Sequence, residues 1–446
     1  MAMKPVLLWS DALFFLLIAA ALAGALWASR IPQLRQSWRK VGESRTGMAA
    51  AVLLLAFLGV AVLDSLHYRE RLPGEGENYA VEVRSALDAL LTGLRTRTER
   101  TYSAPLATHS FAKESLDGEV GRDFPRLVYG GAHLGGDPAG QGTDLLARTV
   151  QGLGTGLLAW FALWLALAPL RRRVPGLAWH AAFLTLLGLC LSAGVVAMLA
   201  QGYHVLGTDK VGQDVLYLTL KSIRTGLLIG TLTTLIMLPA AVALGLLAGY
   251  AGGWVDDVIQ YLYTTLNSIP GVLLIAAAVL MMQVAIDTHP EWFATAAERA
   301  DARLLALCAI LGITSWTGLC RLLRGETLKL RELEYVQAAR SLGVAHARIL
   351  ARHILPNVMH IVMIAIVMDF SGLVLAEAVL SYVGIGVDPN TISFGTMINT
   401  ARMELAREPM VWWSLAAAFI FMFALVLAAN LFADVVRDAF DPRAAR

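Results

Sequence analysis

The sequence predicts an all-α polytopic membrane protein, and three observations support that fold class. Hydrophobic residues make up 57% of the 446 residues, whereas charged residues make up 16%. A soluble protein of this length could not bury so much apolar surface, because much of its exterior must contact water. Apolar stretches near bilayer length recur along the chain, and basic residues collect in a few of the links between them.

About nine apolar stretches approach the roughly 20 residues that a bilayer-crossing helix needs. Pro239 and Pro270 fall inside the two longest stretches and predict kinks or re-entrant entry. The first stretch is expected to be a retained helix rather than a cleaved signal peptide, because its basic residues follow the apolar run. The expected spans are 12–28, 48–66, 152–170, 177–200, 222–250, 256–286, 303–323, 357–383 and 411–436.

Basic residues orient these spans, since they favour the cytoplasmic side of a membrane. One group follows the first span, one the third, one the seventh, and one lies near the C-terminus. All four groups fall on one side if the N-terminus is outside and the C-terminus is cytoplasmic. The groups are Arg30, Arg35, Arg39, Lys40 and Arg45; Arg171, Arg172 and Arg173; Arg321, Arg324, Lys329, Arg331, Arg340, Arg348 and Arg352; and Arg437, Arg443 and Arg446.

A long polar region separates the second and third spans and is expected to be extracytoplasmic, as a small cap or loop without chemistry. Within it, residues 80–96 have apolar side chains spaced for one face of an amphipathic helix. These are Val83, Leu87, Leu90, Leu91 and Leu94. The three cysteines of the chain lie in apolar segments without a CxxC or Cys/His cluster, so they are expected to be small buried hydrophobes.

The cytoplasmic stretch 325–357 is the most informative part of the sequence. Tyr335, Ala338, Ala339 and Leu342 follow the i, i+3, i+4, i+7 spacing of one helical face. Small alanines allow another surface to approach closely. A glycine, Gly343, can end this helix and permit a reversal, and a proline, Pro356, marks entry to the next span. The pattern predicts a helix–turn–helix at the membrane surface that a partner protein contacts.

This stretch resembles the EAA loop of binding-protein-dependent ABC importers, which has Glu-Ala-Ala, three residues, Gly, and then a spaced I-x-L-P. Ala338, Ala339 and Gly343 match that pattern, Gln337 stands in place of the Glu, and His353 in place of the Ile. The ending His-Ile-Leu-Pro-Asn over 353–357 is similar to the C-type subunit of the dipeptide/oligopeptide/nickel permease family.

Three further blocks resemble the same family. Residues 207–216 read GTDKVGQDVL, which is similar to the family's GTDxxGRDxL. Residues 380–387 read LSYVGIGV and are followed by Phe394-Gly395, similar to LSFLGLGV…WG. Asn430, Asp434 and residues 437–443 resemble the C-terminal NxxxDxxRDxxDPR. The resemblance covers about 207–446, together with 35–66 as the first span of the core.

The resemblance implies a six-helix type I ABC importer permease core that carries an extra N-terminal helix and an inserted helical hairpin. It also implies an inner-membrane heterodimer with a B-type permease subunit, two ABC ATPase subunits that bind ATP-Mg, and an extracytoplasmic solute-binding protein. In that family the EAA helix docks into a groove of the ATPase. The coupling residues implied here are Tyr335, Gln337, Ala338, Ala339, Leu342, Gly343 and Pro356.

The expected organisation assigns the additions to the N-terminal half of the chain. No cofactor or metal is expected on the chain itself, and its expected surroundings are membrane lipid and protein partners, with no nucleic acid. The segments are an extra transmembrane helix at 1–34, the first core helix at 35–66, the extracytoplasmic polar region at 67–150, an inserted transmembrane hairpin at 151–201, and the permease core at 202–446 with its coupling loop at 325–357.

Two carboxylates, Asp369 and Glu377, lie within the eighth predicted span, where an ionised group facing lipid is costly. Each should therefore face a cavity, a partner or another helix. Glu377 matches the family pattern and is most simply structural. Asp369 does not match it, which leaves open either a structural hydrogen bond or contact with a cationic solute, such as a peptide amino terminus, in the translocation path.

The expected function is ATP-driven inward transport of di- or oligopeptides or similar solutes without covalent chemistry. The sequence contains no GxxxxGK[ST] phosphate loop, no GxSxG and no HExxH, so ATP hydrolysis is expected in separate subunits. The alternative is a polytopic scaffold or sensor that uses the extra spans to dock other proteins. An ion-coupled secondary transporter would predict an inverted repeat, and no convincing one is found.

Overall fold

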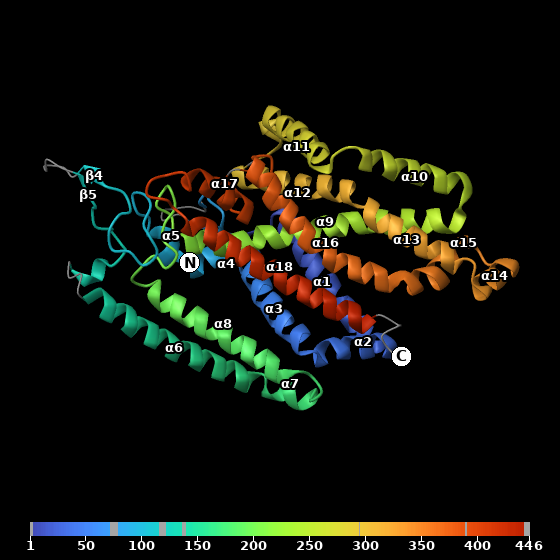
Figure 1. The fold of residues 1–446 in the computed structure, drawn as a ribbon, viewed down its shortest axis with the longest axis horizontal. Helices are drawn as coiled ribbons and strands as arrows, with labels where there is room; N and C mark the ends of the chain where they lie inside the picture. The colour runs from blue at the N-terminus through green and yellow to red at the C-terminus, as the bar shows by residue number, and fades with distance from the viewer. Residues whose placement is uncertain are drawn as a thin grey trace. The chain divides into compact units, whose positions relative to one another are not determined.

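The computed structural model describes residues 3–71, 79–115, 122–135, 140–293, 295–388 and 390–440. Long helices account for most of the regular structure of these residues (Figure 1). Nine helical segments among them are long and apolar enough to cross a membrane, which confirms the predicted fold class and number of spans. These are Trp9–Arg30, Arg45–Ser65, Gly140–Ala166, Trp179–Leu199, Val215–Ala251, Gly271–Thr288, Ala296–Leu330, His346–Val383 and Trp413–Phe440.

The chain divides into two compact units, each built from segments distant in sequence. The first comprises Met1–Leu7, Arg39–Gly226 and Pro389–Ala428. The second comprises Leu8–Trp38, Leu227–Asp388 and Ala429–Arg446. The divisions fall within α2 (Pro32–Glu43), α9 (Val215–Ala251) and α18 (Trp413–Phe440), so these helices contribute residues to both units.

In the first unit, α8 (Trp179–Leu199) packs against both α3 (Arg45–Ser65) and α6 (Gly140–Ala166). Glycines on the facing sides of α6 and α8 let the two backbones touch. A Cβ atom added at Gly152 would lie 2.5 Å from the Cα of Val195, and one added at Gly194 would lie 2.4 Å from the carbonyl oxygen of Gly152. Small residues at a helix crossing allow this close approach. The helix that contains the third span begins at Gly140, earlier than the predicted 152.

The polar part of the first unit contains short elements around a small antiparallel sheet. Strand β1 (Met3–Val6) pairs with β2 (His67–Glu70), and β2 pairs with β3 (Arg84–Ser85). Strands β4 and β5 pair separately, with Glu114 opposite Asp123. The remaining bounds are α4 Ala86–Leu90, α5 Thr92–Thr96, β4 Glu114–Ser115, β5 Arg122–Asp123, a 3₁₀ turn at Ala132–Leu134, α7 Ala168–Arg173 and α17 Phe394–Glu404.

The single amphipathic helix predicted at 80–96 is wrong. Ser85 and Asp88 form a capping box that starts α4 at Ala86, and Leu91 ends it after one turn and a half. Leu87 and Leu94 are buried as the pattern required, but Leu90 is 71% exposed. The cap signal therefore decided where the helix begins, and it divides the expected helix into a strand and two short helices.

In the second unit, α1 (Trp9–Arg30) packs against α12 (Ala296–Ser315), and α11 (Gly271–Thr288) also packs against α12. The backbone N–H of Ser10 donates to Asp301 Oδ2 at 3.1 Å, and both residues are buried. Further along the chain, α13 packs against α10 and α16. The bounds are α10 Gly253–Ser268, α13 Thr317–Leu330, α14 Glu334–Ser341, α15 His346–Ile349 and α16 Leu355–Val383, with a 3₁₀ turn at Pro290–Trp292.

The two prolines of the long apolar stretches have different outcomes. Pro239 lies inside the continuous helix α9, whereas the stretch predicted as one span at 256–286 is broken before Pro270. Ile269 is extended, with φ −94° and ψ 131°, because proline disfavours helical geometry in the residue before it. Of the two resulting helices, α11 has the length and hydropathy of a span.

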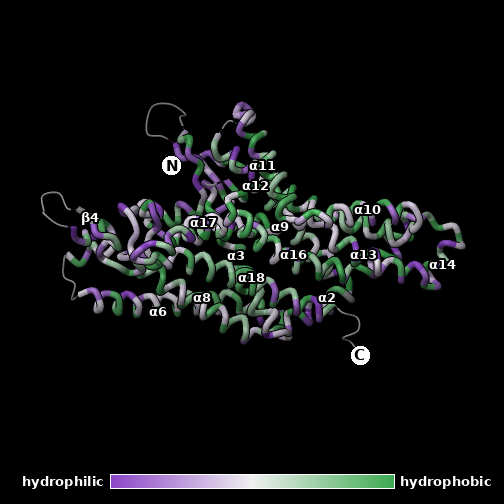
Figure 2. The backbone as a smooth tube through the Cα atoms, turned by 45° about the horizontal axis from the view of Figure 1, so that its top comes forward, coloured by the Kyte–Doolittle hydropathy of each residue, from purple (hydrophilic) through white to green (hydrophobic). Residues whose placement is uncertain are grey.

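The distribution of hydropathy follows the helices. Figure 2 shows hydrophobic residues along most of the long helices and hydrophilic residues concentrated near β4 and α14. Cys308 and Cys320 are fully buried, as predicted, whereas Cys190 is half-buried. All three are free thiols. The polar segments near α14 belong to the predicted coupling loop.

Candidate functional site

The predicted coupling loop lies between α13 and α16 and contains α14 as a separate short helix. Val336 and Ala339 are the buried residues of α14, with exposures of 1% and 9%. Leu342, which caps the helix, is 83% exposed, and Tyr335 and Ala338 are exposed as well. The four residues predicted to share one helical face differ in burial, because Ala339 lies with Val336 on the side toward the protein core.

Gly343 ends α14, as its position in the sequence predicted. It has a φ of +73°, in the left-handed region that glycine adopts without a steric penalty. The N–H of Gly343 donates to the carbonyl of Arg340, and the N–H of Val344 donates to the carbonyl of Ala339, both at 3.1 Å. These two bonds form a Schellman motif, which satisfies carbonyl groups at the helix end and reverses the chain.

Pro356 lies in the first turn of α16, at the entry to the eighth span. The five residues before this helix, Leu350–Ile354, are π-helical, and α15, this segment and α16 form one uninterrupted apolar span from His346 to Val383. Proline offers no N–H and its ring clashes with the carbonyl four residues earlier, so a locally widened helix accommodates it. The predicted second short helix is thus α15, the first part of the long helical segment His346–Val383.

Tyr335 connects α14 with the first part of the segment His346–Val383. Its hydroxyl accepts a hydrogen bond from the side-chain amide of Asn357 at 3.1 Å, and its ring lies 6.2 Å from that of His353. Asn357 also donates to the carbonyl of His353 at 2.6 Å. The ending His-Ile-Leu-Pro-Asn is therefore bonded to the first turn of α14, and the two cannot move independently without losing these contacts.

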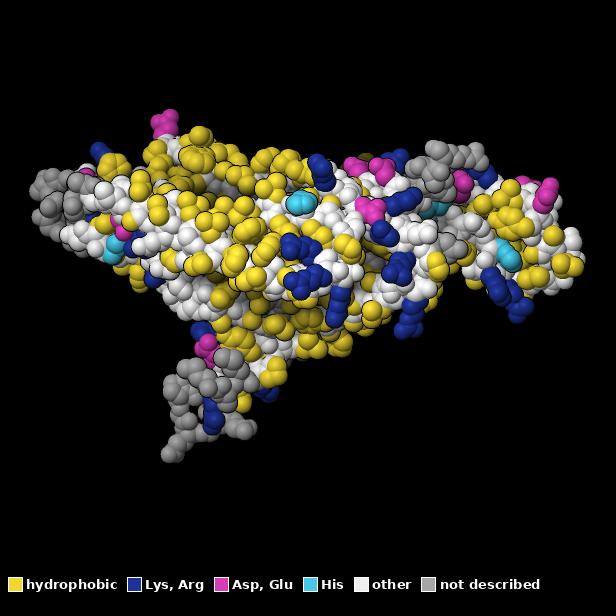
Figure 3. All heavy atoms as spheres, turned by 90° about the horizontal axis from the view of Figure 1, so that it is seen from below, with side chains coloured by type: hydrophobic (Ala, Val, Ile, Leu, Met, Phe, Trp, Pro, Cys, Tyr) yellow, Lys and Arg dark blue, Asp and Glu magenta, His cyan; other side chains and the backbone are white. Residues whose placement is uncertain are grey.

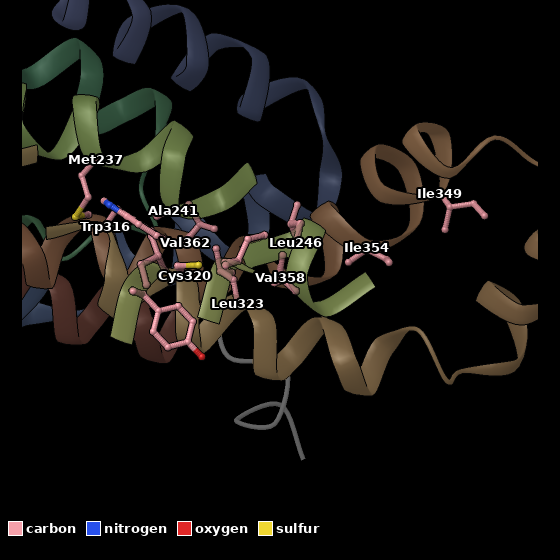
Figure 4. Packing of buried hydrophobic residues seen from close by; sticks show 14 of the residues in the cluster. Met237, Ala241, Leu246, Trp316, Cys320, Leu323, Ile349, Ile354, Val358 and Val362 are labelled. Atoms are coloured by element: carbon pink, nitrogen blue, oxygen red, sulfur yellow. The ribbon is translucent and has the colours of Figure 1, made fainter. Parts of the chain in front are cut away.

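The buried side of the loop merges with the apolar core of the second unit. Figure 4 shows Ile354 and Val358 beside Leu323 of α13. These side chains, with Cys320 and Ile349, are essentially inaccessible to solvent. Close-packed interiors transmit displacement rather than absorb it. A force on the loop would therefore reach α13 and α16.

Polar contacts that the sequence reasoning missed join α13 to the start of α10 and the loop to the end of α9. Arg324 donates to both carboxylate oxygens of Asp256, at 2.5 and 2.7 Å. The hydroxyl of Tyr250 lies 2.8 Å from His346 Nδ1. Asp256 begins the predicted span 256–286 and Arg324 directly follows the span 303–323, so both lie at the predicted cytoplasmic ends, and that signal could have joined them.

A hollow of about 540 Å³ lies beside α14. Its walls come from the junction of α9 and α10, from the residues after α13, and from one side of α14. The lining residues are Tyr250, Ala251, Gly252, Gly253, Arg331, Glu332, Val336, Gln337, Arg340 and Ser341. Gln337, which stands in place of the Glu of the EAA pattern, is exposed at this hollow and donates to the carbonyl of Glu332 at 3.2 Å.

The two carboxylates of α16 differ in their surroundings. Glu377 is buried and accepts a hydrogen bond from the hydroxyl of Ser381 at 2.7 Å, which agrees with a structural role. Asp369 is half-buried and has no hydrogen-bond or ion-pair partner within the described residues. Its assignment to the translocation path stays a prediction.

A second buried polar centre lies in the first unit, where the predicted extracytoplasmic region meets the start of α9. His204 Nδ1 lies 2.7 Å from Asp214 Oδ2, and His204 Nε2 lies 3.3 Å from Glu99 Oε1. Backbone N–H groups of Val128, Tyr129 and Gly130 donate to Glu99 at 2.8 to 3.1 Å. The centre therefore ties three distant chain segments together.

The electrostatics of this centre favour an imidazolium between two carboxylates. Burial alone would lower the pKa of His204, but its hydrogen bonds to Asp214 and Glu99 and their negative charges raise it to about 9. Burial would raise the pKa of Glu99, but the hydrogen bonds from His204 and the backbone lower it to about 2. Both groups are thus charged near neutral pH.

A similar ion pair anchors α4. The ammonium of Lys221 lies 2.8 Å from Asp88 Oδ1 and 3.3 Å from Asp64 Oδ1, and the hydroxyl of Tyr217 donates to Asp88 at 2.8 Å. Burial would raise the pKa of Asp88, but the charge and hydrogen bond of Lys221 lower it to about 2. The polar region is therefore attached by buried charges to α3 and α9.

The geometry defines a class of protein: a multi-pass membrane chain with a surface loop connected rigidly to its spanning helices. A family model described as "Binding-protein-dependent transport system inner membrane component" matches residues 241–446. Of the C-terminal block that resembles this family, residues 441–443 lie outside the described residues. The model match begins within α9 and includes the whole coupling loop.

Curated relatives extend the match. The oligopeptide transport system permease protein of Mycobacterium bovis is 34% identical over 239 residues, covering 54% of this chain and 76% of the relative. The dipeptide transport system permease protein of Lactococcus lactis is 32% identical over 241 residues, covering 54% and 64%. The glutathione transport system permease protein of Pectobacterium atrosepticum is 34% identical over 242 residues, covering 54% and 73%.

Among solved structures, the MetNI methionine ABC transporter in an inward-facing form gives a TM-score of 0.37 at 14% identity, covering 51% of this chain and 98% of that chain. A TM-score this low does not establish a common fold.

The chain belongs to the family of binding-protein-dependent transport system inner-membrane components, and within it to the ABC importer permeases of the peptide type. It is a multi-pass inner-membrane transport subunit and not an enzyme, because members of this family leave ATP hydrolysis to separate subunits. The family implies assembly with other permease, ATPase and solute-binding components.

Proposed function

We propose that this chain forms the translocation pathway of an ATP-driven peptide importer together with a B-type permease subunit. Two ATPase subunits that bind ATP-Mg contact the 325–357 loop, and an extracytoplasmic solute-binding protein delivers the peptide. The names of the relatives support the solute class. The extra helix at 1–34 and the inserted hairpin at 151–201 are additions to the permease core at 202–446.

One observation carries the coupling role: α14 is anchored by buried residues on one side and exposed to solvent on the other. Val336 and Ala339 seat it in the core, whereas Leu342 is the most exposed of the large hydrophobic side chains among the described residues. An apolar side chain held at a rigid turn in the polar part of the chain is a suitable contact for a partner groove.

The termini support the proposed orientation, with the N-terminus outside and the C-terminus cytoplasmic. In the first unit, strand β1 pairs with β2, the strand that begins the 67–150 region, so the N-terminus lies on the side of that region. In the second unit, the ring of Trp38 lies 5.4 Å from that of Phe440, which joins the basic link after α1 to the end of α18. The N-terminus therefore lies with the 67–150 region, which the charge pattern places outside. The end of α18 lies with the basic link after α1, which the charge pattern places in the cytoplasm.

The test is Leu342→Glu in the assembled transporter, with Leu90→Glu as a matched control that makes the same change at an exposed leucine outside the loop. We expect Leu342→Glu to weaken ATPase copurification and ATP-driven peptide uptake roughly tenfold or more, since central contacts dominate interface energy. Thermal stability of the chain should stay unchanged, because Leu342 is not part of the core. Undiminished copurification and uptake in Leu342→Glu would show that α14 does not dock the ATPase.

A further inference from the structure

Two basic segments of the first unit meet at one end of the hairpin formed by α6 and α8. The short helix α7, which follows α6, contains Arg171–Arg173. Arg39 and Lys40 lie near the end of α2, and Arg45 begins α3. These six residues are called the hairpin-base cluster below.

Backbone contacts hold the two segments together. The N–H of Ala178, after α7, donates to the carbonyl of Gly42 on α2 at 2.8 Å. A Cβ atom added at Gly176 would lie 3.1 Å from the guanidinium of Arg39. The basic segment at 39–45 therefore lies against the link between α7 and α8.

Most of the positive charge of the cluster is not neutralised by the protein. Arg39 pairs with Glu43 at 2.8 Å, and Arg171 lies over the ring of Trp164, 5.0 Å from its centroid. Within the described residues, the other four members have no carboxylate at ion-pair distance. These four are Lys40, Arg45, Arg172 and Arg173. Like charges gathered at one end of a hairpin repel one another, and a bound anion would reduce that repulsion.

Tryptophans place the cluster at the level of lipid headgroups. Trp164 lies near the end of α6, and Trp179 begins α8 with its indole N–H donating to the carbonyl of Val174 at 2.9 Å. Tryptophan concentrates at membrane–water interfaces, so these rings mark that boundary. On the membrane side of them, α6 exposes large apolar side chains such as Phe161 and Leu163.

Figure 3 views the side on which α6, α7 and α8 lie and shows Lys and Arg side chains among hydrophobic ones, with a smaller number of Asp and Glu side chains near them. A cationic surface at the edge of an exposed apolar one matches an amphiphile with a negative head and an apolar tail. Guanidinium groups bind phosphate with two parallel hydrogen bonds, and basic clusters beside spanning helices attract anionic lipids.

We propose that the hairpin-base cluster binds the phosphate headgroup of anionic phospholipids, with the acyl chains lying along α6. This site joins the inserted hairpin to the segment at 35–66, and it does not depend on the coupling role of α14. Basic residues also orient membrane segments during insertion. That role alone requires no bound lipid, so the two explanations predict different results.

The test uses the purified full chain in mild detergent, with dioleoylphosphatidylglycerol or dioleoylphosphatidylcholine added at equal concentration. Bound lipid is counted by native mass spectrometry. We expect phosphatidylglycerol to be retained preferentially, and Arg172→Gln with Arg173→Gln to weaken its retention roughly ten- to thirtyfold, because each basic residue near a lipid surface contributes to binding. A rise in salt concentration should reduce retention as well.

Two matched variants make the result decisive. Arg172→Lys with Arg173→Lys keeps the charge and should retain most of the lipid. If the Gln pair inserts or folds poorly, comparing this Lys pair with the unmodified chain still tests whether charge at these positions retains the lipid. Arg122→Gln with Arg126→Gln removes two exposed charges from the polar region and should bind lipid as the unmodified chain does. Equal retention of the two lipids, or equal losses in the cluster pair and the polar-region pair, would overturn the proposal.

Discussion

The coupling loop and the polar region at 67–150 are both polar segments attached to spanning helices, but their attachments differ. The loop is held by apolar burial of Val336, Ala339 and Ile354, with hydrogen bonds at its edge. The polar region is held by buried charges, with His204 between Glu99 and Asp214. Apolar packing does not depend on protonation, whereas a buried ion pair does. The comparison predicts that changes in pH or charge loosen the polar region and leave the coupling loop intact.

The largest effect is expected from His204→Ala. It leaves Glu99 and Asp214 buried without their shared cation, and breaking a buried ion pair in this way costs about 3–5 kcal/mol. We expect the polar region to become susceptible to limited proteolysis while the coupling loop stays protected.

His109→Ala is the matched control, because His109 is exposed and its ring is hydrogen-bonded to the neighbouring Thr108 and to no buried carboxylate among the described residues. Equal protease resistance of His204→Ala and the unmodified chain would mean that the buried centre does not hold the region. Equal sensitivity of both histidine variants would point to a nonspecific effect.

A smaller effect is expected from pH alone. The pKa of His204 is raised to about 9 from an ordinary 6.5, so its stabilisation is complete below about pH 6.5 and is lost as pH rises through 9. The pKa of Glu99 is lowered to about 2 from 4.5, so its stabilisation is present above about pH 4.5 and is lost as pH falls through 2. Stability of the polar region should therefore be greatest between about pH 4.5 and 6.5.

Between pH 6.5 and 9 the loss should approach 3 kcal/mol, since a shift of one pKa unit corresponds to about 1.4 kcal/mol. Proteolysis or hydrogen exchange of residues 79–135 across this range measures it. The same experiment on His204→Ala should show a flat profile. A parallel loss of protection in α14 would contradict the contrast between the two regions.

The smallest effect is expected within α14 itself. Ala339→Leu adds volume to a packed site and should destabilise the chain by about 1–3 kcal/mol, whereas Ala338→Leu on the exposed side should change stability by less than about 0.5 kcal/mol. Thermal unfolding of the two variants measures the difference. Similar unfolding temperatures would mean that Ala339 is not seated in the core.

Much of the architecture was predictable from local sequence. The spans, the stop of α14 at Gly343 and the break before Pro270 follow from apolar length and from the backbone preferences of glycine and proline, which act within a few residues. The sequence pattern failed at 80–96, where the capping box of Ser85 outweighed apolar periodicity. At α14 the periodicity located a shared face without saying which side is buried, and the tertiary structure decided that for Ala339.

The sequence by itself determined that this is a multi-pass membrane protein. It also determined how many of its helices are long enough to cross the membrane and which family its loop resembles. These properties depend on composition and on residues close together in the chain. The tertiary structure alone decided that Arg324 meets Asp256, that His204 lies between Glu99 and Asp214, and that α2 meets the turn after α7. Such contacts join residues far apart in sequence, and their partners are chosen by how the helices pack, which no local pattern records.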